Sequence, residues 1–166
     1  MTDLATLPAA ARVADVPLIP REALFGNPTR AGGQISPDGN WLAWMAPHEG
    51  VMNVWLAPVS DPTAARRMTN ATDRPIPTYF IAPDSRSLLY IQDKAGDQNY
   101  LAYQVGLPGG EERCLTPFEN TRVRLIGFSQ AMKDQALIGL NDRDPRHHDV
   151  HLLVLTTGEL TLLMQN

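Results

Sequence analysis

The sequence predicts an all-β chain built from three four-stranded antiparallel units, and three observations lead to this prediction. Glycine and proline are abundant, with 12 and 14 of the 166 residues, which is typical of a chain with many turns and few long helices. A turn sequence recurs, because Ser36-Pro37-Asp38-Gly39 is followed 46 residues later by Ala82-Pro83-Asp84-Ser85. Four short strands per repeat of this length is the pattern of a blade in a β-propeller. We therefore predict a partial β-propeller of about three blades with a short N-terminal leader.

The repeat extends beyond the turn. Asn53-Val54-Trp55-Leu56 aligns with Asn99-Tyr100-Leu101-Ala102 at an offset of 46 residues, and Met68-Thr69 aligns with Leu115-Thr116 at an offset of 47. A weaker third copy begins at Phe128-Ser129 and continues through Asp149-Val150-His151-Leu152. Several features in the same order are stronger evidence than a single shared tetrapeptide.

The leader is predicted over residues 1–30, and its first 16 or so residues are rich in Ala without a strong period. Pro20 to Phe25 is predicted to form a single helical turn, with Pro20 at the first helical position. Gly26 suits the left-handed conformation that ends many helices. Asn27-Pro28 then interrupts the chain before the first strand.

The propeller region is predicted over 31–166, with blades at about 31–70, 77–117 and 122–164. The predicted strands are 31–36, 41–46, 51–59 and 64–69 in the first blade, 77–82, 87–93, 98–106 and 111–116 in the second, and 122–129, 135–141, 148–156 and 159–164 in the third. Turn residues separate them, as in Pro108-Gly109-Gly110 and Thr157-Gly158.

Three blades are fewer than the roughly four to eight of a closed propeller. Each blade buries its faces against its neighbours, so the first and last blades of an open array would expose apolar faces. We therefore expect a partial chain whose further blades lie elsewhere, or self-association through the exposed blade faces. A self-contained three-blade domain and a two-sheet sandwich are the alternatives.

Composition excludes several classes of protein. The 18 acidic and 14 basic residues give a net charge of −4, which argues against a nucleic-acid or membrane partner. Cys114 is the single cysteine, so an internal disulfide and a cysteine-based zinc site are excluded. Apolar runs such as Leu152–Leu155 are too short to span a bilayer, and Met1–Arg12 does not match a secretory signal. A cytoplasmic location is expected.

Ser129 is the sharpest candidate for a catalytic residue, because Gly127-Phe128-Ser129-Gln130-Ala131 is close to the Gly-x-Ser-x-Gly nucleophile elbow. Three facts argue against this role. Ser129 occupies the repeat position of Ser36, no strand–helix alternation surrounds it, and Ala131 stands where the elbow has glycine. We therefore expect no catalytic residue in this chain.

The densest set of candidate metal ligands is His147, His148, Asp149 and His151. In a strand, His147, Asp149 and His151 would share one face and could hold zinc or copper. The favoured interpretation is a polar strand face and hairpin at the rim of a blade, so no metal or cofactor is predicted, although metal binding by these three residues is left open. Asp93–Asp97 is interpreted as a hairpin turn, because it lacks the spacing and terminal Glu of a calcium loop.

Other side chains are given structural interpretations. The aromatic residues are expected to pack between blades rather than to form a binding cage: Trp41, Trp44, Trp55, Tyr90, Tyr100 and Tyr103. Cys114 is interpreted as a small apolar residue of an outer strand. The arginines at 66, 67, 143 and 146 are interpreted as solvated rim residues.

The ordered landmarks also resemble those of a known family. The segment Leu18–Pro28, the turn at Ser36–Gly39 and Asn53-Val54-Trp55 resemble the start of bacterial serine peptidases of the prolyl oligopeptidase family, in the acylaminoacyl-peptidase and dipeptidyl-peptidase-like branch. Later landmarks are Asp93–Tyr100, Leu115–Phe118 and Asn141–Pro145. The resemblance covers residues 17 to 163 or so. It implies a propeller that accompanies a C-terminal α/β-hydrolase domain with a Ser-Asp-His triad.

This resemblance implies a non-catalytic role. The hydrolase segment has no counterpart here, so the chain alone is expected to be inactive. In the parent enzyme the propeller would cover the hydrolase active site and restrict the access of peptides, and its partners would be the hydrolase domain and the peptide substrate. The alternative is a TolB-like propeller that acts as a protein-interaction module, because the blade turn is also found there. An esterase that uses Ser129 is a third, weaker option.

Overall fold

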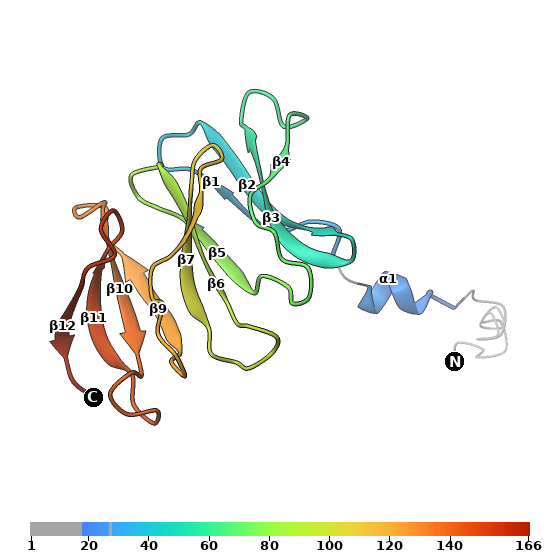
Figure 1. The fold of residues 1–166 in the computed structure, drawn as a ribbon. Helices are drawn as coiled ribbons and strands as arrows, with labels where there is room; N and C mark the ends of the chain where they lie inside the picture. The colour runs from blue at the N-terminus through green and yellow to red at the C-terminus, as the bar shows by residue number, and fades with distance from the viewer. Residues whose placement is uncertain (1–17, 27) are drawn as a thin grey trace, which may run out of the picture.

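The structure, a computed structural model, describes residues 18–26 and 28–166. Within these ranges the chain forms one short helix and three separate four-stranded antiparallel sheets that follow one another along the sequence (Figure 1). The prediction of an all-β partial propeller is thereby confirmed. The Ala-rich beginning of the predicted leader lies outside the described residues.

Each sheet is made of four consecutive strands. The first contains β1 (Ala31–Ile35), β2 (Trp41–His48), β3 (Val51–Pro58) and β4 (Arg66–Arg67). The second contains β5 (Thr78–Ile81), β6 (Ser87–Gln92), β7 (Leu101–Gly106) and β8 (Glu112–Cys114). The third contains β9 (Val123–Phe128), β10 (Gln135–Leu140), β11 (Asp149–Val154) and β12 (Leu160–Met164). Strand order in each sheet follows the sequence. Every strand overlaps the range predicted for it.

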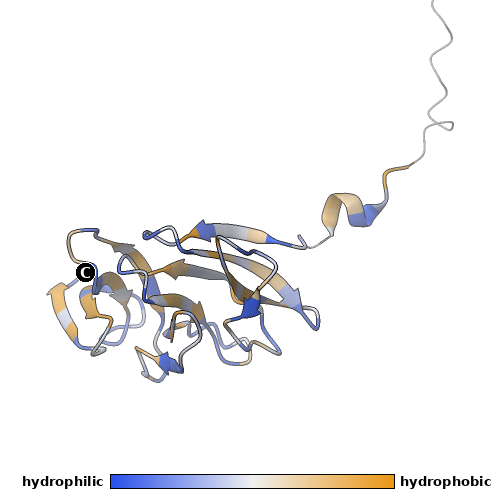
Figure 2. Cartoon of the chain, turned by 90° about the horizontal axis from the view of Figure 1, so that it is seen from above, coloured by the Kyte–Doolittle hydropathy of each residue, from blue (hydrophilic) through white to orange (hydrophobic). Residues whose placement is uncertain are grey.

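The single helix, α1 (Arg21–Phe25), projects away from the sheets and buries none of its side chains (Figure 2). Pro20 is the residue before the helix rather than its first residue. The prediction of a left-handed Gly26 is wrong, because Gly26 is extended with φ −64° and ψ 144°. Its N–H donates to the carbonyl of Glu22 at 2.9 Å, and a side chain at this position would clash with that carbonyl oxygen. Glycine therefore provides close approach here rather than a positive φ.

The predicted blade turns form by local hydrogen bonds. In the first sheet the N–H of Ser36 donates to Trp41 O at 2.8 Å, and the Ser36 hydroxyl donates to Asp38 Oδ1 at 2.5 Å. Gly39 takes the left-handed conformation that this turn needs, with φ +76°. In the second sheet Ser85 does so with φ +60°. The N–H of Asp38 also donates to the Ser85 hydroxyl at 3.1 Å, so the two turns link the first two sheets.

Two hydrophobic cores hold the three sheets together. The side chains that alternate along each strand place one apolar face against the neighbouring sheet. The core between the first and second sheets contains Ala43, Val54, Leu56, Met68, Ala71, Ile76, Tyr79, Ile81, Leu88, Tyr90 and Val105. The core between the second and third contains Ala82, Leu89, Ala102, Leu115, Val123, Ala136, Ile138, Leu140, Leu153 and Leu155. The second sheet is thus buried on both faces, as the middle blade of an array requires.

Two threonines close the outer edge of the first two sheets in the same way. The hydroxyl of Thr69 accepts a hydrogen bond from the N–H of Val54, and that of Thr116 accepts one from Ala102, each at 2.9 Å. The N–H groups of Met68 and Leu115 donate to the carbonyls of Val54 and Ala102, each at 2.8 Å. In each of these two sheets, a Thr hydroxyl thus accepts a hydrogen bond from a backbone N–H of the third strand.

The side chains of Asn53 and Asp149 are buried, and each accepts a hydrogen bond from the backbone N–H of a residue that follows the last strand of its sheet. Asn53 is fully buried; its Oδ1 accepts from the hydroxyl of Thr69 at 2.9 Å and from the N–H of Ala71 at 2.8 Å. Asp149 is 2% exposed, and its Oδ1 accepts from the N–H of Asn166 at 2.9 Å. Asn99, which the sequence alignment places with these residues, instead lies in a loop and bonds to Asp97.

Candidate functional site

Ser129 lies in a blade turn and not in a nucleophile elbow. Its hydroxyl accepts a hydrogen bond from the N–H of Ala131 at 3.2 Å, and its carbonyl accepts one from Met132 at 3.3 Å. The turn connects β9 directly to β10, so no helix follows the serine. Among residues 18–26 and 28–166, the hydrogen-bond partner of this hydroxyl is the N–H of Ala131, whereas an activated serine needs a base within hydrogen-bonding distance.

The four candidate metal ligands near residue 148 do not converge. The expectation that His147, Asp149 and His151 share one strand face is wrong for His147, because a turn closed by its N–H and the carbonyl of Asp144 at 3.0 Å places it before β11. His147 is exposed, whereas Asp149 and His151 are buried. Nδ1 of His151 lies 3.2 Å from the carbonyl oxygen of Asp149. Within 18–26 and 28–166, no group of three or more His, Cys, Asp or Glu side chains could hold a metal ion.

The carboxylate of Asp149 forms an ion pair with an arginine. Nε and Nη2 of Arg143 donate to its two carboxylate oxygens at 2.6 and 2.8 Å, and Nη2 also donates to the carbonyl of Asn166 at 3.0 Å. Arg143 is therefore more than the solvated rim residue that the sequence suggested. The arginine, followed by the N–H of Asn166, lowers the pKa of Asp149 well below its ordinary value.

Acid is expected to weaken the fold through Asp149. Because the pKa of Asp149 is lower in the folded than in the unfolded chain, its ion pair stabilises the folded state above the ordinary pKa of 3.8. This contribution is lost as the pH falls through 3.8 toward the folded-state value. Thermal unfolding from pH 7 to pH 3 should show a smaller acid-induced loss of stability in Asp149→Asn than in the unchanged chain. Asp142→Asn, at an exposed position of the same loop, is the control, and an equal acid response in the Asp149→Asn variant would contradict the assignment.

The segment at Asp93–Asp97 is a connection between β6 and β7, as predicted, but it is longer than a tight hairpin because β7 begins at Leu101. Its carboxylates are used within the loop. Asp97 Oδ1 accepts from the N–H groups of Lys94 and Asn99 at 3.3 and 3.0 Å. Asp93 Oδ2 accepts from the N–H of Gln98 at 3.2 Å. These hydrogen bonds shape the loop.

The aromatic side chains pack singly or in pairs rather than as a cage. Tyr90 and Tyr103 stack with their ring centroids 5.3 Å apart, and the Tyr90 hydroxyl donates to Glu112. The Trp55 indole N–H donates to the carbonyl of Ala46 at 3.1 Å. Arginine guanidinium groups cover two other rings, as Arg30 lies over Trp44 at 5.3 Å and Arg122 over Tyr100 at 5.2 Å.

Cys114 and the remaining rim arginines take part in ordinary contacts. Cys114 ends β8 and is half-buried, and this burial raises the pKa of its thiol. A raised pKa disfavours the reactive thiolate. Arg146 pairs with Asp144 at 2.8 Å, and Nη2 of Arg67 donates to Asn70 at 2.8 Å.

An open groove of about 460 Å³ lies between the edge strands β5 and β9. From the second sheet it is lined by Thr78, Phe80 and Ile91, among others, and from the third by Arg122, Arg124 and Leu125. The sequence analysis did not identify this groove. Its walls come from two different blades, so no local sequence pattern indicated it.

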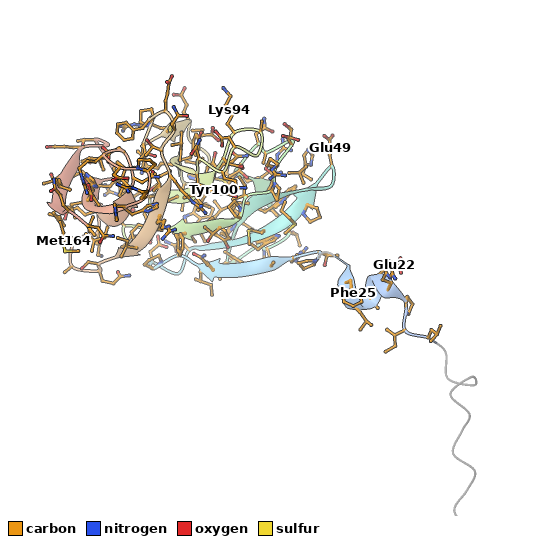
Figure 3. All side chains as sticks on the ribbon, turned by 90° about the horizontal axis from the view of Figure 1, so that it is seen from below. Glu22, Phe25, Glu49, Lys94, Tyr100 and Met164 are labelled. Atoms are coloured by element: carbon orange, nitrogen blue, oxygen red, sulfur yellow. The ribbon has the colours of Figure 1, made fainter. Side chains whose placement is uncertain are left out.

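The first and third sheets each leave one face uncovered by another sheet. On the first sheet, Ile35 is 63% exposed and pairs with the half-buried Leu42. On the third, half-buried Leu152 points away from the core that contains Leu153, and Met164 at the outer edge is 60% exposed (Figure 3). No helix among the described residues has the length and apolar character needed to cross a bilayer.

Two curated relatives match almost the whole chain. Dipeptidyl aminopeptidase BIII of Pseudoxanthomonas mexicana is 45% identical over 158 residues, which are 95% of this chain and 23% of the relative. Dipeptidyl peptidase family member 6 of Caenorhabditis elegans is 29% identical over 158 residues, which are 91% of this chain and 21% of the relative. The chain thus spans less than a quarter of the length of either relative. No family model matches the chain.

Solved structures with the same fold include peptidases and TolB. An acylaminoacyl peptidase of Pyrococcus horikoshii has a TM-score of 0.58 and 17% identity, over 83% of this chain and 25% of that one. TolB of Acinetobacter baumannii has a TM-score of 0.57 and 20% identity, over 82% of this chain and 32% of that one. These structures support the propeller fold alone. Together with the 45% identical relative, they confirm the predicted resemblance to the propeller of prolyl oligopeptidase-type peptidases.

Proposed function

We propose that this chain is the non-catalytic β-propeller portion of a prolyl oligopeptidase-like serine peptidase. In that enzyme it covers the active site of an α/β-hydrolase domain and restricts the access of peptides. The observation that carries the proposal is the 45% identity to dipeptidyl aminopeptidase BIII over 95% of this chain. Because that match covers 23% of the relative, most of a peptidase would lie outside the segment that matches this chain.

Two structural features support a larger parent protein. The first and third sheets have apolar faces that would pack against further blades. The leader also exposes apolar side chains, with Leu18 92% and Phe25 79% exposed, and these suit packing against another domain. We accordingly divide the chain into a leader over 1–30 and three blades over 31–166, with the hydrolase domain and its peptide substrate as partners. The lone cysteine, without a disulfide partner, favours a cytoplasmic location.

The access function is tested on the native enzyme that contains this segment. Loosening the contact between the second and third sheets with Leu153→Ala should raise the cleavage rate of long peptides relative to that of a dipeptidyl anilide. Arg86→Gln, at an exposed turn, is the control and should leave the ratio unchanged. An unchanged ratio in Leu153→Ala, with the variant shown to be folded, would contradict restricted access.

The TolB-like alternative is favoured by one observation, the TM-score of 0.57 to TolB. A TolB-like propeller acts through its surface and needs no hydrolase domain in the same polypeptide. A native polypeptide made of blades alone, without reaction with an active-serine probe, would favour this alternative over the peptidase.

The isolated chain is expected to self-associate through its free blade faces. Light scattering at high protein concentration should give a mass above 18.3 kDa, because apolar faces that meet water favour association. Leu152→Lys places a charge on the free face of the third sheet and should shift the equilibrium toward monomer. Glu111→Lys changes an exposed turn and is the control. A monomer of the unchanged chain at high concentration would contradict the expectation.

A further inference from the structure

We propose that Arg113 is a latch between the second and third blades, and that Arg66 repeats this latch between the first and second. In each case the arginine lies in the last strand of one sheet and contacts the turn that precedes the last strand of the next sheet. The latch controls how readily neighbouring blades separate at this end of their boundary. The inference does not rest on the proposed function, because both partners of each contact belong to this chain.

Arg113 reaches from β8 to the turn between β11 and β12. Its Nη1 donates to the carbonyl of Thr156 at 2.8 Å, and its Nη2 donates to the carbonyl of Thr157. These carbonyls lie 43 and 44 residues further along the chain, in the third blade. Two successive carbonyls suit the forked donors of a guanidinium, and hydrogen bonds from a charged donor are stronger than those between neutral groups. Arg113 therefore links the third blade directly to the second.

The turn that Arg113 contacts is fixed within its own blade. The N–H and the hydroxyl of Thr156 donate to the two carboxylate oxygens of Asp134, at 3.0 and 2.7 Å. The N–H of Gly158 donates to the carbonyl of Val154 at 2.7 Å. Because these hydrogen bonds hold the turn, those of Arg113 connect the second blade to the third sheet rather than to a loose loop.

The latch crosses a part of the blade boundary that the apolar core does not fill. An open groove of about 530 Å³ lies there, and its lining includes Gln104 and Arg113 from the second blade and Asp134 and Thr156 from the third. None of the described apolar residues that form the core between these two sheets lines this groove. At this end of the boundary, the hydrogen bonds of Arg113 therefore oppose separation of the two blades.

Gly158 gives the arginine room to approach. A Cβ at this position would lie 2.6 Å from Nη2 of Arg113, which is too close for atoms that are not bonded. An alanine at position 158 would thus push the guanidinium away from the two carbonyls that it contacts. The latch can be opened from either blade, by a change at Arg113 or by a change at Gly158.

Arg66 occupies the same position in the first blade. Met68-Thr69 aligns with Leu115-Thr116 at an offset of 47 residues, and the same offset aligns Arg66 with Arg113. A Cβ at Gly109, in the turn between β7 and β8, would lie 3.3 Å from Nη1 of Arg66. Among the described residues, Arg66 packs on this turn without a side-chain hydrogen bond to it, so the larger effect is expected at Arg113.

A double-mutant cycle between Arg113 and Gly158 tests the latch. Urea unfolding of the 166-residue chain gives the folding equilibrium constant of each variant. Because Gly158→Ala already displaces the guanidinium, Arg113→Ala should lower this constant about fivefold in the unchanged chain and less than about twofold in the Gly158→Ala background. Additive effects of the two substitutions, in variants that circular dichroism shows to be folded, would overturn the proposal.

Gly50→Ala is the matched control for this cycle. Gly50 has φ +83°, close to the +78° of Gly158, but a Cβ there would meet no heavy atom of the described residues within 4 Å beyond its chain neighbours. The backbone strain of the two alanine variants is therefore similar, whereas Gly158→Ala also displaces an arginine. Arg113→Ala should keep its full cost, about fivefold, in the Gly50→Ala background. A reduced cost there as well would attribute the coupling to backbone strain and would reject the latch.

Amide hydrogen exchange shows which parts of the chain the latch protects. In Arg113→Gln, peptides that cover β8 and the turn between β11 and β12 should exchange about fivefold faster, while those that cover β1 and β2 stay unchanged. Arg113→Lys keeps the charge but loses the forked donors, and it should fall between the two. Arg86→Gln removes another arginine that lines the same groove, and it should exchange like the unchanged chain.

Two results of the exchange experiment would contradict the proposal. Unchanged exchange at the turn between β11 and β12 in a folded Arg113→Gln variant would overturn the latch. Arg66→Gln should speed exchange at the turn between β7 and β8, and an unchanged rate there would overturn the repeat of the latch in the first blade.

Discussion

Replacement of Asn53 by Ala is expected to lower the free energy of unfolding by about 3 kcal/mol. The side chain is fully buried, and its amide also donates to the carbonyls of Val51 and Ala71 at 3.1 and 2.9 Å. Alanine would leave the Thr69 hydroxyl and the Ala71 N–H without the acceptor that Asn53 provides. Buried donors without an acceptor lose their hydrogen bond and are not rehydrated, so the cost is larger than that of an exposed bond. Urea unfolding followed by tryptophan fluorescence measures the change.

Asn99→Ala is the matched control for this prediction. Asn99 aligns with Asn53 in the sequence repeat, but it is half-buried and its side chain bonds to the exposed Asp97 at 3.3 Å. Its replacement should cost less than about 1 kcal/mol. Equal losses in the two variants would show that Asn53 does not hold the end of the first sheet.

Replacement of Leu153 by Ala should also cost about 3 kcal/mol. Leu153 is fully buried in the core between the second and third sheets, where it lies with Ile138 and Leu115. A smaller side chain leaves a cavity, because the surrounding strands are fixed by their hydrogen-bonded ladders and cannot close around it. Thermal and urea unfolding of the purified chain measure the loss.

Leu163→Ala removes the same atoms from the same sheet at a position that is 54% exposed, and it should cost less than about 0.5 kcal/mol. The difference between the two leucines follows from the face-to-face packing of the blades. If Leu163→Ala destabilised the isolated chain as much as Leu153→Ala, the third sheet would not pack on the second as described.

Much of the fold could be predicted from the sequence because the turns carry local signals. The turn at Ser36–Gly39 forms by hydrogen bonds among neighbouring residues, so four residues are enough to identify it. The strands between such turns are short and apolar, and the length of the repeat fixes their number. The interpretation of Ser129 as a turn residue follows from the same logic, since its repeat position is that of Ser36.

The features that could not be predicted depend on contacts that no local sequence pattern specifies. The side chain of Asn53 accepts a hydrogen bond from the N–H of Ala71, 18 residues away, and no local pattern distinguishes Asn53 from Asn99. The pairing of Arg143 with Asp149 depends on the turn that precedes β11, which also removes His147 from the strand face. The extended Gly26 was missed because a glycine after a helix suits either a left-handed residue or a close backbone approach.

The groove was missed for a related reason. Its two walls come from β5 and β9, about 45 residues apart in the repeat, and their approach depends on the packing of one blade on the next. The groove exists only because the third blade packs on the second, so it becomes visible when the blades are in place.

The proposal that this chain is part of a peptidase is tested most directly on the native polypeptide. An antibody raised against the 166-residue chain, used on an extract of the cells that make the protein, gives the mass of the native polypeptide, and a fluorophosphonate probe reports an active serine on the same band. We expect a band several times larger than 18.3 kDa that reacts with the probe, while the isolated chain does not react. A native band of 18.3 kDa, or a larger band without an active serine, would contradict it.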